Sequence, residues 1–439
     1  MIDWDNIDGD YKIFEDPIHG YIKINSNILQ FIDTRQFQRL RYLKQLGTLS
    51  YIFHSANHTR FEHSIGVGYL SGQLLINLKK DQPELDINNK NINLINLAGL
   101  LHDIGHGPFS HVFDSEFIPL IYPNTNYKHE LMSNRMIEYL IDDNYIDIDT
   151  TDINFIKNII ESPKNISDRL NDKDYLYEIV ANSTNCIDVD KFDYLSRDMY
   201  YLFGSEKSYN FNRIFKYNRI IDNTICYNSK ITFDIYNLFQ QRYFMHKQIY
   251  NHNKGKAIEY MICDILLKAN NKLQIAECIN NPSDFINLTD DIINIIKISK
   301  DPELNDSKLL INRLEKRDLY KFIDEYIVPI ELSNKIKSIK AIDIISYNSE
   351  LCNKILIDDL IIFDKKINFN LNDKNPVDNV YFYNIKNKNI KYKKNKENIS
   401  LLLPNIFEER IIRLYSKIND NLINSLLKDA FNLYIKQFN

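Results

Sequence analysis

The chain has 439 residues, of which 44% are hydrophobic and 26% charged, a composition that excludes fibrous and wholly disordered proteins. Glycine and proline number only 11 each, and this scarcity favours long helices over a turn-rich all-β architecture. The 54 basic and 59 acidic residues give a net charge of −5, so the surface as a whole is not built to bind nucleic acid.

The sequence has no stretch apolar enough to span a membrane, and its start, MIDWDNIDGD, is acidic where a secretory signal would be basic and then apolar. The five cysteines are scattered without a CxxC pair, which fits reduced thiols and excludes a zinc site built from cysteine. We therefore expect an intracellular protein, cytoplasmic or nuclear, with no membrane partner. Any metal site must use histidine and carboxylate.

The first long pattern along the chain is helical. From residue 31 to about residue 203, apolar side chains recur every three or four positions, as in NINLINLAGLLHDIG. From about residue 358 short β-rich runs follow, LIIFDKKINFNL and VYFYNIKNKNIKY, and a final amphipathic helix is expected from about Pro404. These patterns predict a mainly α fold with a helical core and a C-terminal mixed α/β lobe.

Histidine is concentrated in one part of the chain. Of 10 histidines, seven fall within residues 54–129. His102 and Asp103 end a predicted helix, because glycines and a proline follow directly, and His106 and His111 lie on the turn beyond. A His-Asp pair facing one cleft suits a divalent transition metal. Two ligands are too few, so others must come from elsewhere in the chain.

Two further segments offer those ligands, HTRFEHS with His63 and NCIDVDKFDYLSRDMYYLFG. At about 100° per residue, a helix over the second segment has an apolar stripe opposite a polar stripe that contains Asp190, Tyr194, Arg197 and Asp198. A polar helix face is often merely solvated. The order H, HD and D along the chain, with more histidines beside the HD, favours a metal site.

This spaced pattern is typical of the HD phosphohydrolase superfamily. The stretches FEDPIHGYI, IDTRQFQRLRYLKQLG, RFEHSIGVGYL, LAGLLHDIGHGPFSHVFD, LYEIV, IDVDKFDYLSRD and NPVDNVYFY closely resemble, in this order, the SAM-and-HD-domain dNTP triphosphohydrolase family. The resemblance runs from about Lys12 to the C-terminus. It implies an HD catalytic domain over residues 1–265 and a C-terminal α/β lobe over residues 266–439 that contributes to oligomerisation and to the allosteric site. We expect the sterile-alpha-motif domain of animal members to be absent.

The resemblance implies a metal-dependent hydrolase that converts dNTPs to deoxynucleosides and inorganic triphosphate. The expected metal is Fe, Mn or Zn, with Mg on the nucleotide phosphates. Its ligands are His63, His102, Asp103 and Asp190. The residues that match the catalytic machinery are His106, His111, His129, Asp114 and Glu130, and the residues alone do not assign their separate roles.

Substrate contacts are also implied. Basic side chains close to the metal ligands suit a triphosphate, and the candidates are Arg60, Lys191 and Arg242. Selecting deoxyribose needs hydrogen bonds to the 3′ hydroxyl and no room at the 2′ position. The matching sugar contacts are Gln45, Tyr194 and Asp198, with Leu46 and Tyr250 against the 2′ carbon.

Control by a guanine nucleotide, GTP or dGTP, is the last expectation. Asp33 can accept from the N1 and N2 edge of guanine, and Gln38 and Arg41 can donate to its O6 and N7, a pattern that adenine cannot satisfy. The residues that match phosphate contacts are Lys12, Arg413 and Lys417. Nucleotide binding would assemble a homo-oligomer, expected to be a tetramer, whereas a constitutively active oligomer is the alternative.

A second activator position is matched only in part. Arg213 and Lys230 are present, but other residues stand where the animal enzymes carry Arg, Asn, Arg and Lys. These residues are Asn228, Asp234, Gln248 and Asn253.

Two other functions stay open at this point. An HD phosphodiesterase or nucleotidase acting on other phosphoesters would use the same metal ligands, and a single-stranded nucleic acid binding module could keep the fold. Intact Arg60, Lys191, Tyr194 and Asp198 favour a deoxynucleoside triphosphate over the first alternative. The complete metal set and the acidic net charge argue against the second.

Overall fold

The computed structural model describes residues 11–163, 165–170, 173–333 and 335–438. Contacts divide the chain into two compact units. The first comprises Met1–Leu238, Ala276–Ile292 and Val377–Leu401, and the second comprises Phe239–Ile275, Ile293–Pro376 and Leu402–Asn439. Each unit is thus assembled from three separate stretches, whereas the predicted division after residue 265 is a single cut and stays a prediction about domain organisation.

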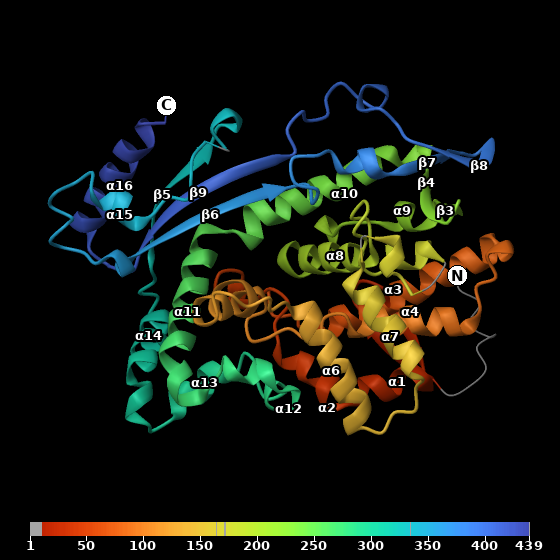
Figure 1. The fold of residues 1–439 in the computed structure, drawn as a ribbon, viewed down its shortest axis with the longest axis horizontal. Coiled ribbons are helices and arrows are strands. Elements are labelled where there is room, and N and C mark those ends of the chain that lie inside the picture. The colour runs from red at the N-terminus through yellow and green to blue at the C-terminus, as the bar shows by residue number, and fades with distance from the viewer. Residues whose placement is uncertain (1–10, 164, 171–172, 334, 439) are drawn as a thin grey trace. The chain divides into compact units, whose positions relative to one another are not determined.

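The predicted fold class, mainly α with a C-terminal α/β lobe, is confirmed (Figure 1). Most of the regular elements of the first unit are helices: α1 (Ser26–Ile32), α2 (Arg35–Gln38), α3 (Arg60–Asp81), α4 (Asn89–Leu101), α5 (Ile118–Ile121), α6 (His129–Asp143), α7 (Thr150–Glu161), α8 (Val189–Phe203), α9 (Asn212–Lys216) and α12 (Pro282–Phe285). No helix among the described residues is both long enough and apolar enough to cross a membrane.

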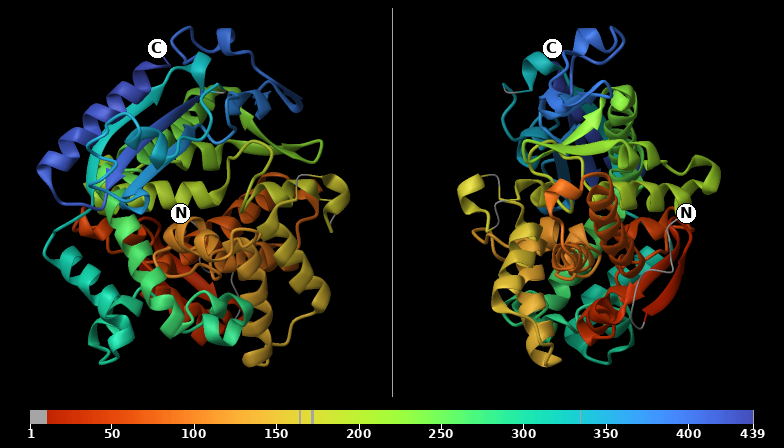
Figure 2. Two further views of the ribbon diagram at one scale, coloured as in Figure 1. Left: turned by 60° about the vertical axis from the view of Figure 1, so that its left-hand side comes forward. Right: turned by 90° about the vertical axis from the view of Figure 1, so that its right-hand side faces the viewer.

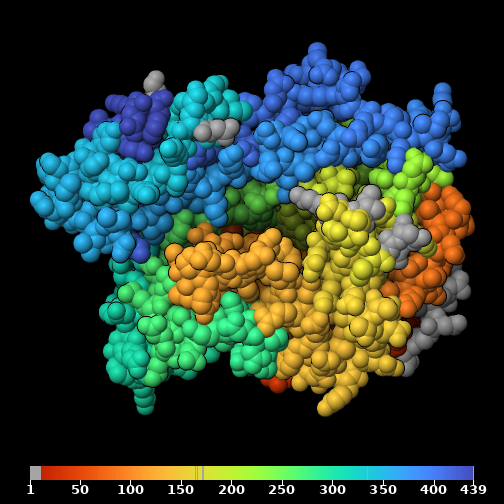
Figure 3. Space-filling view, viewed as in Figure 1, coloured from red at the N-terminus to blue at the C-terminus, as the bar shows by residue number. Residues whose placement is uncertain are grey.

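The first unit also has two sheets. One is the antiparallel hairpin of β1 (Tyr11–Asp16) and β2 (Gly20–Asn25). The other has four strands in the order β3 (Asn218–Ile221), β4 (Thr224–Asn228), β7 (Tyr381–Asn384) and β8 (Asn387–Tyr392). β4 and β7 pair in parallel, so the β7–β8 hairpin extends a sheet that begins much earlier in the chain, and its surface lies beside that of β3 and β4 in Figure 3.

Close packing of α3 against α4 brings two histidine-bearing segments together. A Cβ at Gly99 of α4 would lie 2.3 Å from Ser71 Oγ and 2.9 Å from Val67 O on α3, so only glycine fits this contact. α4 ends at Leu101 with His102 as its C-cap, as the glycines and proline after it predict. The contact therefore fixes the start of α3 and the end of α4 near each other.

The second unit combines helices with one sheet. α10 (Thr232–Met245) spans the boundary between the units. The remaining elements are α11 (Asn253–Leu273), α13 (Ile292–Ile298), α14 (Asn305–Glu315), β5 (Lys321–Val328), α15 (Ala341–Ile345), β6 (Leu360–Asn368), β9 (Glu408–Ser416) and α16 (Asn421–Lys436). The sheet has the antiparallel order β5-β9-β6, and α16 packs beside it over a core that includes Ile412, Leu414 and Phe431 (Figure 2).

The prediction of a helix from about Pro404 was wrong in its start. Glu408–Ser416 is the central strand β9, and the amphipathic helix α16 begins only at Asn421. The last seven residues of β9 are all buried, with Arg410, Arg413 and Ser416 among them, so the strand has no alternation of buried and exposed residues. Such a pattern does not distinguish a buried strand from a buried helix.

Candidate active site

Polar side chains from three helical segments converge in the first unit. His63 lies in the first turn of α3, His102 and Asp103 lie at the end of α4, and Asp190 lies in the first turn of α8. His63 Nε2 is 3.2 Å from Asp190 Oδ1 and 3.6 Å from Asp103 Oδ2. His102 Nε2 is 3.4 Å from Asp103 Oδ1 and 3.6 Å from Asp190 Oδ1.

These separations suit ligands of one ion. Donor atoms about 2.1 Å from a tetrahedral metal lie about 3.4 Å apart. The structure therefore contains a His/Asp group that can hold a divalent metal ion, in which His63, His102 and Asp103 offer mutually close donor atoms.

The outer nitrogens of both imidazoles are held by acceptors. His102 Nδ1 lies 2.7 Å from Gly99 O, and His63 Nδ1 lies 2.7 Å from Asp193 Oδ2. Each Nδ1 therefore carries a hydrogen and donates it, and each Nε2 faces the group, where its lone pair can bind a metal. Buried His102 Nε2 has no hydrogen-bond partner among the described residues. Two imidazoles and two carboxylates fit a divalent transition metal.

The charges of this group hold one another ionised. Burial alone would raise the pKa of Asp103, but the charge of His102 holds it well below its usual value. Burial would also raise the pKa of Asp190, which the adjacent imidazoles of His102 and His63 lower. For His63, burial opposes the charged form, but hydrogen bonds to Asp190 and Asp193 raise its pKa to about 10. A metal that binds at neutral pH therefore displaces a proton.

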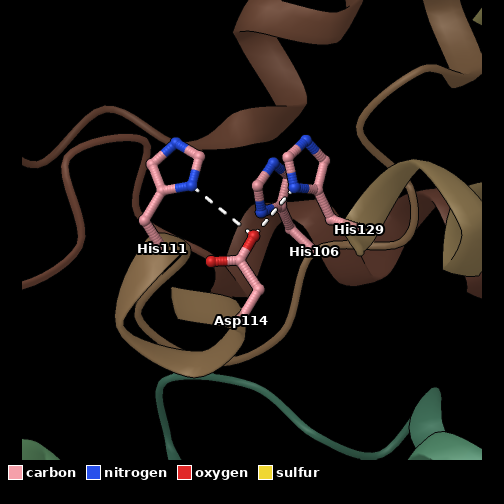
Figure 4. Close-up of side chains that lie close together, drawn as sticks. All are labelled: His106, His111, Asp114 and His129. Atoms are coloured by element: carbon pink, nitrogen blue, oxygen red, sulfur yellow. Dashed lines mark hydrogen bonds and ion pairs between the residues drawn. The ribbon is translucent and has the colours of Figure 1, made fainter. Parts of the chain in front are cut away.

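A second polar cluster of His106, His111, Asp114 and His129 adjoins this group (Figure 4). His129 Nδ1 is 2.8 Å and His111 Nδ1 is 3.5 Å from Asp114 Oδ2. The rings of His106 and His129 stack with their centroids 3.9 Å apart, on the opposite side of Asp114 from His111. His106 Nε2 also lies 3.3 Å from Asp103 Oδ1, so His106 joins the two clusters.

Burial and charge give these groups different protonation behaviour. Burial, and then the positive charge of Arg60, holds the pKa of His106 well below its usual value, so that ring is neutral at neutral pH. Burial would raise the pKa of Asp114, but hydrogen bonds from His111 and His129 lower it, and the carboxylate stays ionised. The side chain of His111 is 70% exposed, which leaves this imidazole accessible to a bound molecule.

Two of the predicted phosphate contacts are already paired with carboxylates. Arg60 is buried; its Nε donates to Ser110 Oγ at 2.8 Å and its Nη1 donates to Asp103. Lys191 Nζ donates to Asp188 Oδ2 at 2.8 Å, and Asp188 is also the N-cap of α8. A phosphate group bound here would have to share these cations with the carboxylates.

The predicted sugar contacts of the first unit are connected through His58. His58 Nε2 lies 2.7 Å from Asp198 Oδ1, and its carbonyl accepts from Gln45 N at 3.0 Å. Gln45 Oε1 is buried without a hydrogen-bond partner among the described residues. Leu46 follows it and is half-buried, and Tyr194 precedes Asp198 by one turn on α8.

Arg242 and Tyr250 belong to the second unit. Arg242 lies in α10, and its Nη1 donates to Asn368 O at 2.8 Å. Tyr250 ends a π-helical turn, a rare element that often marks functional sites. Their contact with substrate stays a prediction.

The residues predicted to read guanine gather in the first unit. Lys12 Nζ lies 3.4 Å from Asp33 Oδ2, and both side chains are exposed. Gln38 Nε2 donates to Ile32 O at 2.9 Å, next to Asp33, and Arg41 Nε donates to Gln38 Oε1 at 2.7 Å.

The other predicted activator residues carry ion pairs of their own. In the second unit, Arg413 Nε lies 2.6 Å from Glu325 Oε2 and Lys417 Nζ lies 2.6 Å from Asp264 Oδ2. In the first unit, Arg213 Nη1 lies 3.0 Å from Asp234 Oδ2. Each pair must open or rearrange before a phosphate can bind the cation. Lys230 lies beside Asn228, whose side chain accepts from its backbone N–H.

Sequence reasoning missed His58, Ser110 and Asp193, which hold predicted site residues in place. Asp193 could have been found, because at about 100° per residue it lies near Asp190 on the polar stripe of α8. His58 and Ser110 could not, since each is defined by a partner far away in the chain, 140 residues for His58 and Asp198.

An HD domain model matches residues 60–198, the stretch that contains all four convergent donors. The chain is 40% identical over 429 residues to the deoxynucleoside triphosphate triphosphohydrolase SAMHD1 homolog of Dictyostelium discoideum, covering 98% of this chain and 81% of that protein. The chain belongs to this family. The SAMHD1 triphosphohydrolases of Bos taurus and Homo sapiens are each 39% identical to it, over 93% and 92% of this chain and 75% and 70% of theirs. The resemblance inferred from the motifs is confirmed.

Proposed function

We propose that this chain hydrolyses dNTPs to deoxynucleosides and inorganic triphosphate in a metal-dependent reaction. The observation that carries the proposal is the convergence of His63, His102, Asp103 and Asp190, with donor separations of 3.2–3.6 Å, in a member of this family. The metal is Fe, Mn or Zn, and Mg accompanies the nucleotide phosphates.

A bound divalent ion would polarise a phosphoryl oxygen and lower the pKa of water. Release of triphosphate in one step breaks the bond between the α-phosphorus and the 5′ oxygen; water supplies oxygen to phosphorus, and the 5′ oxygen takes a proton. His111 provides that proton, a role supported by its 70% exposure and by the ionised Asp114 beside it. His106, which is neutral, orients the attacking water together with His129, which has Glu130 at 3.7 Å.

Substrate binding uses the remaining predicted residues. Arg60 and Lys191, fixed beside the metal ligands, neutralise the triphosphate with Arg242, which suits a chain that is acidic overall. Gln45, Tyr194 and Asp198 bind the sugar, and Leu46 and Tyr250 exclude the 2′ hydroxyl.

Hydrolysis is tested by incubating the purified chain with each dNTP and separating the products by chromatography. Deoxynucleoside and triphosphate are expected, whereas dNMP with pyrophosphate, or stepwise phosphate release, would contradict the proposal. Asp190→Ala should abolish turnover because a metal ligand is lost. Asp142→Ala, which changes an exposed aspartate on α6 of the same unit, is the matched control and should leave turnover unchanged.

Activation is the second part of the proposal. GTP or dGTP binds through Asp33, Gln38 and Arg41, with Lys12, Arg413 and Lys417 on its phosphates, and assembles a tetramer. The adjacency of Lys12, Asp33, Gln38 and Arg41 supports the guanine-reading part. At the second activator position, Asp234 neutralises Arg213, which weakens any site formed with Lys230.

Sedimentation and activity measured together, with and without GTP, test activation. A mass that rises with GTP alongside activity is expected. Full activity without guanine nucleotide, or an unchanging mass, would show that assembly is constitutive.

A further inference from the structure

Asp193 is a fully buried carboxylate one turn beyond Asp190 on α8. Its Oδ2 accepts from His63 Nδ1 at 2.7 Å and its Oδ1 accepts from His19 Nε2 at 2.6 Å. Arg197, one turn further along α8, donates to both oxygens from Nε and Nη2 at 2.9 Å. Both oxygens of this carboxylate therefore have partners, and none of those partners is solvent-exposed.

The charge of Asp193 is fixed by this arrangement. The guanidinium of Arg197 donates to both of its oxygens, and a carboxylate in such a bidentate ion pair is ionised. An ionised carboxylate only accepts hydrogen bonds, so His63 must donate from Nδ1 and keep Nε2 toward the other metal donors. Asp193 thus sets both the tautomer and the orientation of that ring.

His19 reaches Asp193 from the N-terminal hairpin. It lies in the turn between β1 and β2, where Asp16 Oδ1 accepts from the backbone N–H of His19 at 3.0 Å and of Ile18 at 2.8 Å. Asp16 Oδ2 lies 2.9 Å from Arg197 Nη1. The turn is therefore held against α8 by two polar contacts, and both end on the pair formed by Asp193 and Arg197.

We propose that Asp193 is the positioning residue for the metal ligand His63, and that His19 makes the metal affinity of the site depend on the seating of the β1–β2 hairpin. The inference rests on the proposed metal site. Neither residue offers an atom to the metal: Asp193 acts by holding the ring of His63, and His19 acts by holding Asp193. Loss of the His19 contact leaves the carboxylate held by Arg197 and His63 alone, which loosens its position behind the ring of His63.

Binding of Mn²⁺ to the purified full chain tests this, with free Mn²⁺ measured by electron paramagnetic resonance. Asp193→Asn should weaken binding by about 10–100-fold, the usual effect of removing a carboxylate behind a ligating histidine, and His19→Ala by a smaller factor of about 3–10. Glu178→Gln, a buried carboxylate changed to an amide without contact to a metal ligand, is the matched control and should bind as the parent does. Asp103→Asn, which removes a metal ligand, should abolish Mn²⁺ binding at this site.

A second measurement does not need metal. In chain labelled with ¹⁵N-histidine, the ring signals of His63 should show a hydrogen-bonded Nδ1–H in the parent, and this signature should be lost in Asp193→Asn. If Asp193→Asn does not fold, His19→Ala decides the question, because it leaves the pair of Asp193 and Arg197 intact.

Folded variants at both positions that bind Mn²⁺ with parental affinity would overturn the inference and leave the proposed function standing. Failure of the parent to bind Mn²⁺ in a manner that depends on Asp103 would instead remove the metal site, and the inference with it.

Discussion

Replacing Gly66 with alanine tests the contact between α3 and α8 on which the site depends. An added Cβ would lie 2.0 Å from Asp193 Oδ1 and 2.7 Å from Arg197 Nη2, both buried. Either the helices separate or the Asp193 carboxylate moves, which breaks the bonds of its Oδ1 to His19 and Arg197 and shifts its Oδ2 from His63. Overpacking costs about 1–3 kcal/mol and a broken buried ion pair about 3–5 kcal/mol, against a gain of about 1 kcal/mol for alanine in a helix. The net loss is then about 0–2 kcal/mol if the helices separate and about 2–4 kcal/mol if the ion pair breaks. Because the Cβ would lie only 2.0 Å from the carboxylate oxygen, we expect the second.

Gly72→Ala on the same helix is the matched control. Its Cβ would meet Asn96 Nδ2 at 3.1 Å and nothing else closer than 3.6 Å, so the helical gain should leave stability within about 1 kcal/mol of the parent. Urea unfolding followed by circular dichroism compares the two variants, and Mn²⁺ binding should fall only in Gly66→Ala. Equal unfolding midpoints for the two variants would refute this reasoning.

Four further outcomes are expected. Burial raises the pKa of Glu178 to about 7, so the folded state binds this proton more tightly than the unfolded state does. The free energy of unfolding of the parent should therefore fall by up to about 3 kcal/mol as the pH rises from 4.5 to 7. Glu178→Gln should not show this fall when urea unfolding is compared at pH 5 and pH 8. His58→Ala frees Asp198 from its 2.7 Å bond and should raise KM for dNTPs about tenfold in steady-state assays, with a smaller change in kcat. Leu46→Ala should raise NTP hydrolysis by opening the 2′ position, a change worth about 1–3 kcal/mol of discrimination. Chelator dialysis should abolish turnover, and added Mn²⁺ should restore it.

The metal group could be predicted from the sequence because its chemistry lies in residue type and order. His63, the His102-Asp103 pair and Asp190 are recognisable along the chain, and the two helices that carry His63 and Asp190 follow from apolar spacing. Asp193 was not singled out, although it lies near Asp190 on the helix, because its partner depends on how α3 meets α8. A helical wheel identifies a polar face but not what covers it.

Pairing between strands that are distant in the chain could not be predicted from the sequence either. The segment EERIIRLYS was expected within a helix, yet it is the central strand β9, whose backbone is hydrogen-bonded to β5 on one side and to β6 on the other. Its burial on both faces removes the alternation that would identify a half-exposed strand. The lobe was predicted as mixed α/β from the short β-rich runs LIIFDKKINFNL and VYFYNIKNKNIKY, which precede this segment.

The parallel pairing of β4 with β7 has a consequence for synthesis of the chain on the ribosome. Cys226, Tyr227 and Asn228 pair with Tyr381, Phe382 and Tyr383, and the whole second stretch of the other unit is translated between them. The unit that carries the candidate active site therefore cannot complete its sheet until nearly all of the chain has emerged. Until then the edge of β4 is unpaired and open to wrong partners, which makes this strand a point where chaperone protection would matter.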